Sequence, residues 1–247
     1  SWLRNFKIKN ETIKKKIKFS LEEGNFYPIQ EKHNLTLENK KVIEDFHRLY
    51  FNMLEKKSGL QISWLGHQTG KTPLDLWLYQ EIIVKKKPDL IIETGTHWGG
   101  SAVFLSTICN ILGIGEVLSI DLYPKKNLPK VDKLKYLHGS SIDGEIIKKV
   151  KEKCENKNNV MVILDSNHET SHVLEELRLY SEFISKNGYL IVEDTFLNGH
   201  PSHKSFGSGP YEAVELFLKE NNKFEIDKAL EKFLFTLNYN GFLRRVK

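Results

Sequence analysis

The chain has 247 residues, of which 40% are hydrophobic, so it can form one large domain with a substantial core. Its 37 basic and 32 acidic residues leave a net charge of +5, and the excess lysine near the N-terminus has no interleaved arginine or aromatic residues, which disfavours nucleic-acid binding. No apolar stretch is long enough to cross a membrane, and two isolated cysteines, Cys109 and Cys154, make neither a metal cluster nor a disulfide framework. We therefore expect a cytoplasmic protein with no membrane span and no nucleic-acid partner.

The N-terminal third is expected to form a helical cap. Its first residues are polar and irregular, and apolar residues then recur at helical spacing over 39–57. A second helix is predicted over 73–87, because Pro73 stands at its start, where a missing backbone N–H costs least. We divide the chain into an extension that contains this cap and lid, residues 1–84, and a main domain, residues 85–247.

The main domain alternates short apolar runs with helical patterns. Strands are predicted over 89–93, 115–121, 133–139, 159–165 and 188–194, and helices over 99–112, 143–154, 170–186 and 209–220. The last segment, 233–246, is predicted to form an antiparallel hairpin that turns at Asn240 and Gly241. Strand–helix alternation with almost continuously apolar strands indicates a doubly wound α/β fold, in which helices cover both faces of a mostly parallel sheet.

One short motif, GHQTGKT at residues 66–72, resembles a phosphate-binding P-loop. The P-loop pattern needs four residues between its glycines, whereas three separate Gly66 from Gly70. A P-loop wraps its backbone N–H groups around phosphate oxygens, so a shorter loop has a different curve. Because only a weak strand precedes the motif and Pro73 follows it, we do not expect it to bind a nucleoside triphosphate.

In a doubly wound sheet, ligands bind beyond the carboxyl ends of the strands. The first predicted strand of the main domain ends at Glu93, and three glycines surround the turn into the next helix: Gly95, Gly99 and Gly100. Glycine lets the backbone approach a ligand closely. Because His97 stands where the dinucleotide-binding pattern needs glycine, the loop favours a nucleoside ligand without a pyrophosphate. The alternative for Glu93 is a helix cap.

Two further strand ends carry residues suited to a nucleoside. Asp121 ends the second strand, where an acidic side chain can accept hydrogen bonds from ribose hydroxyls. Ser140, Ser141 and Asp143 follow the third strand and could border an adenine ring. The alternative for Asp121 is an ordinary turn residue.

Three carboxylates lie at the ends of the fourth and fifth strands: Asp165, Glu193 and Asp194. In a cleft they repel one another and need a counterion, and an all-oxygen group suits Mg²⁺ or a similar hard cation. His168 lies on the loop after Asp165, and its pKa suits proton abstraction near neutral pH. The carboxylates could instead be solvated turn residues, and His168 an ordinary surface histidine. The order of glycine loop, Asp121 and acidic group along the chain favours a functional site.

Three stretches, 79–105, 163–195 and 233–245, resemble the cephalosporin hydroxylase / rhamnosyl O-methyltransferase family of class I S-adenosylmethionine-dependent methyltransferases. The likeness runs from about Trp64 to Arg245, and the ETGTHWGGS and VEDT runs carry most of its specificity. It implies a Rossmann-like, seven-stranded sheet of the class I methyltransferase type. It also implies an enzyme that methylates hydroxyl groups of sugars, glycans or glycosylated metabolites.

The resemblance further implies which residues contact the cofactor. We expect S-adenosylmethionine to contact Glu93, Gly95, Thr96, Gly99, Gly100, Ser101, Asp121, Ser140, Ser141 and Asp165. Within this set, the glycine loop would hold the methionine part, Asp121 the ribose, and one of the two later serines would face the adenine.

The resemblance assigns Asp165, Glu193 and Asp194 as ligands of Mg²⁺ or another hard divalent cation. Candidates for catalysis are Asp165, His168 and His200. His168 occupies the position at which more distant relatives, the metal-dependent catechol O-methyltransferases, carry a lysine base. Because His200 and His203 lie on the loop that matches the substrate side of the family, the identity of the base stays open.

The implied reaction depends mainly on alignment and on a deprotonated acceptor oxygen, because a methyl group on a sulfonium is already electrophilic. The expected partners are a small-molecule or glycan acceptor and further copies of the chain, since the relatives are oligomers. One alternative is a catalytically inactive binding protein with this fold. Another is a metal-dependent oxygenase that uses His168 or His200 with Asp165, which requires two histidines and a carboxylate around one iron.

The GHQTGKT segment also has a counterpart in the related fold, where it passes over the cofactor pocket. We predict that residues 64–72 form a lid over the cofactor, with Gly66 and Gly70 giving flexibility. Lys71 or Gln68 would then contact the methionine carboxylate or the acceptor.

Overall fold

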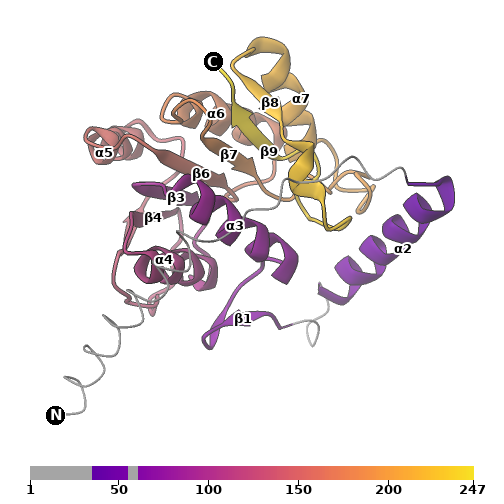
Figure 1. The fold of residues 1–247 in the computed structure, drawn as a ribbon, viewed down its shortest axis with the longest axis horizontal. Coiled ribbons are helices and arrows are strands. Elements are labelled where there is room, and N and C mark those ends of the chain that lie inside the picture. The colour runs from indigo at the N-terminus through magenta and orange to yellow at the C-terminus, as the bar shows by residue number, and fades with distance from the viewer. Residues whose placement is uncertain (1–34, 55–60) are drawn as a thin grey trace.

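The computed structural model describes residues 35–54 and 61–247. The lysine-rich segment 7–18 and the predicted end of the first helix, 55–57, lie outside these residues. The described chain forms a seven-stranded sheet with helices on both faces (Figure 1). No helix within the described ranges combines the length and the apolar character needed to cross a membrane.

The elements alternate as expected in the main domain. The sheet contains β3 (Leu90–Thr94), β4 (Glu116–Asp121), β5 (Leu134–His138), β6 (Val160–Leu164), β7 (Tyr189–Val192), β8 (Phe224–Ile226) and β9 (Phe242–Arg245). The helices are α2 (Leu37–Leu54), α3 (Pro73–Lys86), α4 (Gly100–Leu112), α5 (Gly144–Cys154), α6 (Thr170–Ser181), α7 (Pro210–Glu220) and the short 3₁₀ helix η1 (Lys228–Glu231). A small hairpin, β1 (Ser63–Trp64) and β2 (His67–Gln68), precedes α3.

The strand order is β5-β4-β3-β6-β7-β9-β8, in which β9 alone runs antiparallel to both of its neighbours. The chain therefore starts in the middle of the sheet at β3, extends to β5 at one edge, and returns to β6 on the other side of β3. The carboxyl ends of β3, β4, β6 and β7 meet at this reversal point, which is where such sheets bind ligands. This confirms the predicted doubly wound, mostly parallel sheet with antiparallel strands at its C-terminal edge.

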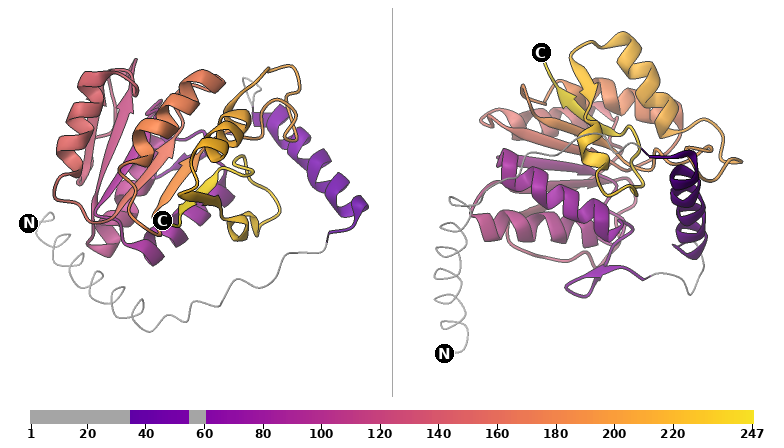
Figure 2. Two further views of the ribbon diagram at one scale, coloured as in Figure 1. Left: turned by 90° about the horizontal axis from the view of Figure 1, so that it is seen from above. Right: turned by 45° about the vertical axis from the view of Figure 1, so that its right-hand side comes forward.

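Successive residues of the central strands face opposite sides of the sheet, so each strand contributes to two cores. Leu90 and Ile92 of β3 join the core under α5, α6 and α7. Ile91, between them, joins the core under α3 and α4. This explains why the strands are apolar at nearly every position. Figure 2 shows the helices on the two sides of the sheet, with α2 (indigo) set apart at the edge of the molecule.

Helix α2 packs on a third, smaller apolar cluster. Its residues Tyr50, Phe51 and Leu54 contact the cluster formed by Phe196, Leu197, Phe235 and Leu237. The buried His47 side chain fastens the helix, with Nδ1 2.9 Å from Ser202 Oγ and Nε2 3.2 Å from the carbonyl oxygen of Thr236. Burial lowers the pKa of His47 to about 4, so the ring is neutral at physiological pH.

Two predicted boundaries are wrong. The C-terminal hairpin does not turn at Asn240, because the residues before it form no strand and β9 pairs with β7 and β8 instead. The buried carboxylate of Asp75 accepts hydrogen bonds from Thr236 Oγ1 and from the backbone N–H of Leu237, which fixes this segment outside the sheet. Helix α6 ends at Ser181 rather than at 186. Directly after Ser181, backbone hydrogen bonds between residues three apart replace the α-helical ones, so the chain continues as turns.

The strand β8 and the predicted domain boundary at residue 84 also differ from, or go beyond, what the sequence could establish. The short edge strand β8 was not predicted, because only three of its residues pair. The predicted domain boundary at residue 84 stays a prediction, although α3 packs into the same core as the sheet.

Candidate active site

The glycine loop after β3 is shaped by close backbone contacts. Gly95 has a φ of +87°, and a Cβ there would lie 1.8 Å from the carbonyl oxygen of Asp165. A Cβ on Gly100, the first residue of α4, would lie 2.1 Å from the carbonyl oxygen of Gln68. Both positions therefore require glycine. The second contact also places the β1–β2 hairpin directly against the start of α4, as a lid over the loop would require.

Glu93 lies buried at the end of β3. Its Oε2 accepts a hydrogen bond of 2.7 Å from Ser119 Oγ, and its Oε1 is buried with no hydrogen-bond partner among the described residues. Burial raises the pKa of Glu93, while the nearby charge of Lys71 opposes this. The capping alternative is wrong, because Gly99 is the N-cap residue of α4. A buried carboxylate oxygen without a partner is suited to a hydrogen-bond donor of a ligand.

Asp121 fastens the glycine loop to β4. One carboxylate oxygen, Oδ2, accepts hydrogen bonds from the backbone N–H groups of Thr96 and His97, each at 2.9 Å. The other, Oδ1, accepts one of 2.7 Å from the N–H of Tyr123. The ribose contact of Asp121 stays a prediction. In this structure, the carboxylate sets the position of the loop.

The residues expected beside the adenine lie just after β5. Ser141 is buried, with its Oγ 3.1 Å from His172 Nε2, and Ser140 precedes it in the same turn. Their adenine contacts stay predictions. Asp143 has a structural role, because its carboxylate accepts a hydrogen bond from the N–H of Glu145 and caps α5.

Lys71 lies inside the acidic group at the ends of β6 and β7. Its side chain is only 5% exposed, and its ammonium pairs with Asp165 and lies 3.0 Å from Glu193 Oε1. Glu93 is near enough to contribute to its electrostatics as well. These carboxylates raise the pKa of Lys71 against the opposing effect of burial, so the side chain is a permanent internal cation.

Glu193 is oriented by its neighbours on the inner side of the site. Tyr79 of α3 donates a hydrogen bond to Glu193, and Asn238 Nδ2 donates one of 2.8 Å to the Tyr79 hydroxyl. Burial and the charge of Asp165 raise the pKa of Glu193 to about 8, although Lys71 acts in the opposite direction. Glu193 therefore faces Lys71 and Tyr79 in this structure.

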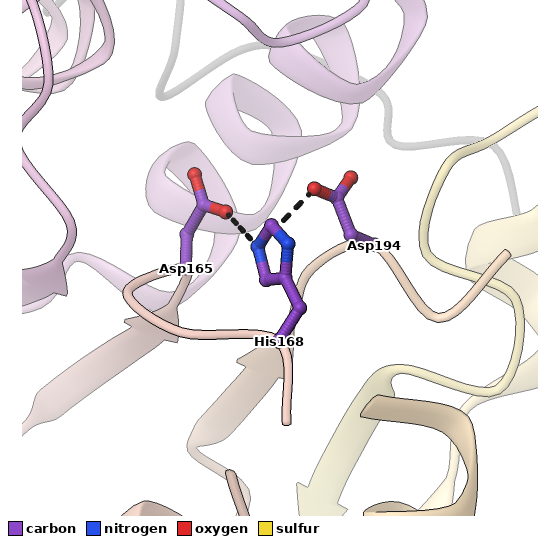
Figure 3. A group of neighbouring side chains, drawn as sticks. All are labelled: Asp165, His168 and Asp194. Carbon is purple, nitrogen blue, oxygen red and sulfur yellow. Dashed lines mark hydrogen bonds and ion pairs between the residues drawn. The ribbon is translucent and has the colours of Figure 1, made fainter. Parts of the chain in front are cut away.

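His168 lies between two aspartates, as Figure 3 shows. Its Nε2 is 3.3 Å from Asp165 Oδ1 and 3.3 Å from Asp194 Oδ2. One ligand atom from each of the three lies within 4.8 Å of the others, close enough to hold a metal ion together. Burial lowers the pKa of His168, but the two aspartates outweigh it and raise that pKa to about 9. Without a bound cation, His168 is therefore protonated at neutral pH.

The comparisons with known proteins identify the family. A family model described as Rhamnosyl O-methyltransferase/CmcI matches residues 56–246. The chain belongs to the rhamnosyl O-methyltransferase/CmcI family. The rhamnosyl O-methyltransferase of Mycobacterium tuberculosis (strain ATCC 25618 / H37Rv) is 37% identical over 212 residues, which cover 83% of this chain and 85% of that protein. The one of Mycobacterium leprae (strain TN) is 35% identical over 212 residues, covering 83% and 90%.

Solved structures of CmcI share the fold of this rhamnosyl O-methyltransferase/CmcI family member. An apo structure of CmcI aligns with a TM-score of 0.60 at 18% identity, covering 88% of this chain and 87% of that one. A CmcI structure with Mg and SAM aligns with a TM-score of 0.60 at 17% identity, covering 88% of each chain. Together with the family match, this makes the protein an S-adenosylmethionine-dependent O-methyltransferase with a class I methyltransferase fold, as the sequence predicts.

The other two histidines of the substrate-side loop have different partners in this family member. His200 Nε2 lies 3.1 Å from Glu212 Oε1, and its ring stacks on Tyr211 with a centroid distance of 3.6 Å. His203 contacts the rings of Phe51 and Phe206. Within the described residues, neither joins the group of Asp165, His168 and Asp194. The oxygenase alternative, which needs a second histidine there, has no geometric support.

Sequence analysis missed three partners of the acidic group: the ion pairs of Lys71, the hydroxyl of Tyr79 and the amide of Asn238. Buried carboxylates such as those of Glu93 and Glu193 require an internal cation, and Lys71 precedes the predicted helix at Pro73, so this partner could have been inferred. The P-loop interpretation was correctly rejected. Thr72 caps α3, accepting a hydrogen bond of 3.0 Å from the N–H of Asp75, and Lys71 points into the acidic group.

Proposed function

We propose that this O-methyltransferase transfers the methyl group of S-adenosylmethionine to a hydroxyl of a sugar, in a glycan or a glycosylated metabolite, with the help of a divalent cation. The observation that carries the proposal is the position of His168 between Asp165 and Asp194, next to the glycine loop. The names of the 37% and 35% identical relatives, both rhamnosyl O-methyltransferases, support a sugar acceptor. Homo-oligomer formation, expected from the resemblance, stays a prediction.

The residues around the glycine loop fit the cofactor. Glu93 Oε1, buried and unpaired among the described residues, is suited to the ammonium of the methionine part. Gly95 and Gly100 leave no room for side chains, so the backbone itself forms this wall of the site. Asp121, together with Thr96, would hold the loop in place beneath the ribose. S-adenosylmethionine supplies an electrophilic methyl group.

The donor set also fits a hard divalent cation. Asp165 Oδ1 and Asp194 Oδ2 are carboxylate oxygens that face the same point, and His168 lies beside them. We propose these two aspartates as ligands. Glu193 is a third candidate, and its carboxylate would have to exchange contacts with Lys71 to join them. Bound here, a divalent cation such as Mg²⁺ supplies positive charge, which lowers the pKa of an acceptor hydroxyl and of His168.

His168 is the proposed general base. In its neutral form it accepts the proton of the acceptor hydroxyl at Nε2. The protonated ring is then stabilised by Asp165 and Asp194, whose carboxylates lie 3.3 Å from that nitrogen. Lys71 favours the ionised form of Asp165 and, 3.0 Å from Glu193 Oε1, holds both carboxyl groups in position. His200 is not favoured as the base, because its Nε2 pairs with Glu212.

The test is methyl transfer by the purified protein to a defined rhamnoside. The protein is incubated with S-adenosylmethionine, Mg²⁺ and methyl α-L-rhamnopyranoside or a rhamnosyl disaccharide, and products are analysed by mass spectrometry. We expect a product heavier by one methylene group, and its formation should stop when excess EDTA is added. No methylated sugar from either acceptor would contradict the proposed acceptor class, and full activity in EDTA would contradict the cation.

A further inference from the structure

A pocket outside the acidic group lies beside helix α2. It has a volume of about 400 Å³, within the range of about 300–1,000 Å³ that is typical of small-molecule sites. Its walls include Ile43 of α2, His200, Tyr211 of α7, Leu234, Tyr239 and Asn240. We call it the α2 pocket. Among these residues, His200 is the one named above as a candidate base, and its Nε2 pairs with Glu212.

One wall of the α2 pocket is continuous with the loop that carries His168. A Cβ on Gly209 would lie 3.3 Å from the carbonyl oxygen of His168, and Thr170 Oγ1 donates a hydrogen bond of 3.1 Å to the carbonyl of Gly209. The N–H of Gly209 bonds to Glu212 at 2.8 Å, and Glu212 in turn holds His200 at the pocket. Gly209 therefore connects the loop of His168, the proposed base, to the wall of the pocket that contains His200.

A second segment links the α2 pocket to Asp194. The backbone N–H of Asp194 donates a hydrogen bond of 3.1 Å to Asn238 Oδ1. Two residues later, Asn240 reaches the α2 pocket, and Tyr239 between them also lines it. The lining of the α2 pocket is thus linked through two short segments to His168 and Asp194, which places the pocket near the acidic group.

The lining combines aromatic rings with a buried acceptor atom. His200 and Tyr211 stack in parallel, at an interplanar angle of 7°, and Ile43 and Leu234 add aliphatic surface. Asn240, which lines the pocket, donates its Nδ2 to the Tyr211 hydroxyl at 3.0 Å. The other polar atom of this amide, Oδ1, is buried and has no hydrogen-bond partner in the part of the chain that the structure describes. A buried acceptor of this kind is satisfied by a hydroxyl donor.

The charges at the α2 pocket favour a neutral ligand. Lys40 is accompanied by the acidic residues Glu44 and Glu231, so no surplus of positive charge is present for a phosphate or a nucleotide. Glu231 is also engaged, because it accepts a hydrogen bond of 2.9 Å from the N–H of Asn240. A pyranose ring matches this surface, since it offers an apolar C–H face to aromatic rings and hydroxyl donors at its edge.

We propose that the α2 pocket binds a second sugar ring of the acceptor, next to the ring that is methylated. This inference rests on the proposed sugar acceptor. It assigns Asn240 Oδ1 as an acceptor for a hydroxyl of that ring, and the side chains of Ile43 and Tyr211 as contacts of its apolar face. The pocket would then select disaccharide units over single sugars.

The test compares a charged residue placed inside the pocket with the same change just outside it. Ile43→Glu introduces a carboxylate into the pocket, whereas Val42, the preceding residue, is 61% exposed and Val42→Glu is the matched control. The acceptors are methyl α-L-rhamnopyranoside and the methyl glycoside of an α-(1→3)-linked rhamnose disaccharide. For Ile43→Glu we expect the ratio of the disaccharide KM to the monosaccharide KM to rise about ten-fold, and for Val42→Glu the ratio should match the wild type.

Because Ile43→Glu could also act by disturbing the fold of α2, a second variant changes a pocket residue outside that helix. Asn240 has a φ of +61°, so Asn240→Gly removes the Oδ1 acceptor in a conformation that glycine adopts freely. We expect the same rise in the KM ratio, with the melting temperature reported for each variant. An unchanged ratio in both variants, or an equal rise in Val42→Glu, would overturn the proposal.

A binding measurement separates failure of the subsite from failure of the proposed function. Saturation-transfer NMR records contact between the disaccharide and the protein without any turnover. If neither sugar is methylated, the proposed function fails. Whether the disaccharide binds in the α2 pocket is then judged from the NMR signal alone. A signal in the wild type and Val42→Glu that is lost in Ile43→Glu and Asn240→Gly supports it. No signal in the wild type, or a signal that survives in both pocket variants, overturns it.

Discussion

The two sides of the site are built in different ways. The proposed cofactor side is made of backbone: Gly95 and Gly100 allow contacts that no side chain would permit, and Asp121 binds the loop through its N–H groups. The proposed acceptor side is made of side chains from distant segments, such as His200 stacked on Tyr211. A class of enzymes that keeps one cofactor and varies its acceptor would be expected to divide in this way. The backbone would bind the constant cofactor, and the side chains would bind the acceptor, which differs between enzymes.

Asp165 connects these two sides. Its carbonyl oxygen lies against Gly95, and its carboxylate pairs with Lys71 through Oδ2 and with His168 through Oδ1. A change at this residue therefore affects both sides at once, whereas changes elsewhere affect one. The predictions below use this difference.

The largest effect is expected for Asp165→Ala. Because it removes a proposed cation ligand and a partner of both His168 and Lys71, we expect methyl transfer to fall by about 1,000-fold. The rate is measured with the rhamnoside acceptor at saturating S-adenosylmethionine. Asp227→Ala is the control, because that aspartate caps η1 and bonds to the Tyr189 hydroxyl outside the candidate site, and it should cost about 2 kcal/mol of stability and no activity. Similar rates for the two variants would remove Asp165 from the mechanism.

The next effect tests the cofactor side alone. Gly95→Ala places a Cβ against the carbonyl of Asp165 at a positive φ, so we expect it to lower the free energy of unfolding by about 4 kcal/mol. Binding of S-adenosylhomocysteine, measured by calorimetry, should be lost.

Gly113 provides the control for this substitution. It also has a positive φ, of +70°, but a Cβ there would meet nothing within 4 Å. Gly113→Ala should therefore cost about 1 kcal/mol and leave cofactor binding intact. If both variants bind the cofactor equally, the close approach of backbone at Gly95 does not shape the cofactor site.

The difference between the two sides also explains why the residues of the proposed cofactor side could be predicted from the sequence. Glu93, Asp121 and Asp165 each end a buried strand, and parallel strands bring their carboxyl ends to one edge, so a local pattern predicts a shared location. The cofactor loop follows from one nine-residue run for the same reason. The mostly parallel sheet and its two-sided core also follow from the alternation of apolar runs and helices, whereas the strand order comes from the structure.

The acceptor side could not be predicted in this way. Its contacts join residues that are far apart in the chain, as between His47 of α2 and Thr236, or Asn238 and Tyr79. No periodicity reports such pairs. The segment before β9 has an alternating pattern typical of a strand, yet the buried carboxylate of Asp75 holds it out of the sheet. Tertiary hydrogen bonds here override the local preference.

Lys71, in the segment between β2 and α3, gives the third prediction. Lys71→Met leaves Asp165 and Glu193 buried without their cation, and we expect a loss of about 3 kcal/mol in the free energy of unfolding at pH 8. The loss should be smaller at pH 5, where Glu193 can take up a proton. Urea unfolding at both pH values measures it. Equal losses at both pH values would show that the charge of Lys71 is not what stabilises the site.

The smallest expected effect is the contribution of His168 protonation to the pH dependence of the free energy of unfolding. The pKa of His168 is about 9 in the folded protein, compared with 6.5 when unperturbed, so the folded state binds this proton more tightly. The resulting stabilisation is fully present below pH 6.5 and is lost as the pH rises through about 9. We expect it to contribute about 2 kcal/mol in the metal-free protein.

The measurement is urea unfolding in EDTA at several pH values between 6.5 and 9, for the wild type and for His168→Gln. The variant cannot take up the proton, so its stability should decline less steeply with pH over this range. His200→Gln is the control, because its ring pairs with Glu212 on the acceptor side, away from the two aspartates. If His168→Gln and the wild type show the same pH dependence, the two aspartates do not hold a proton on His168.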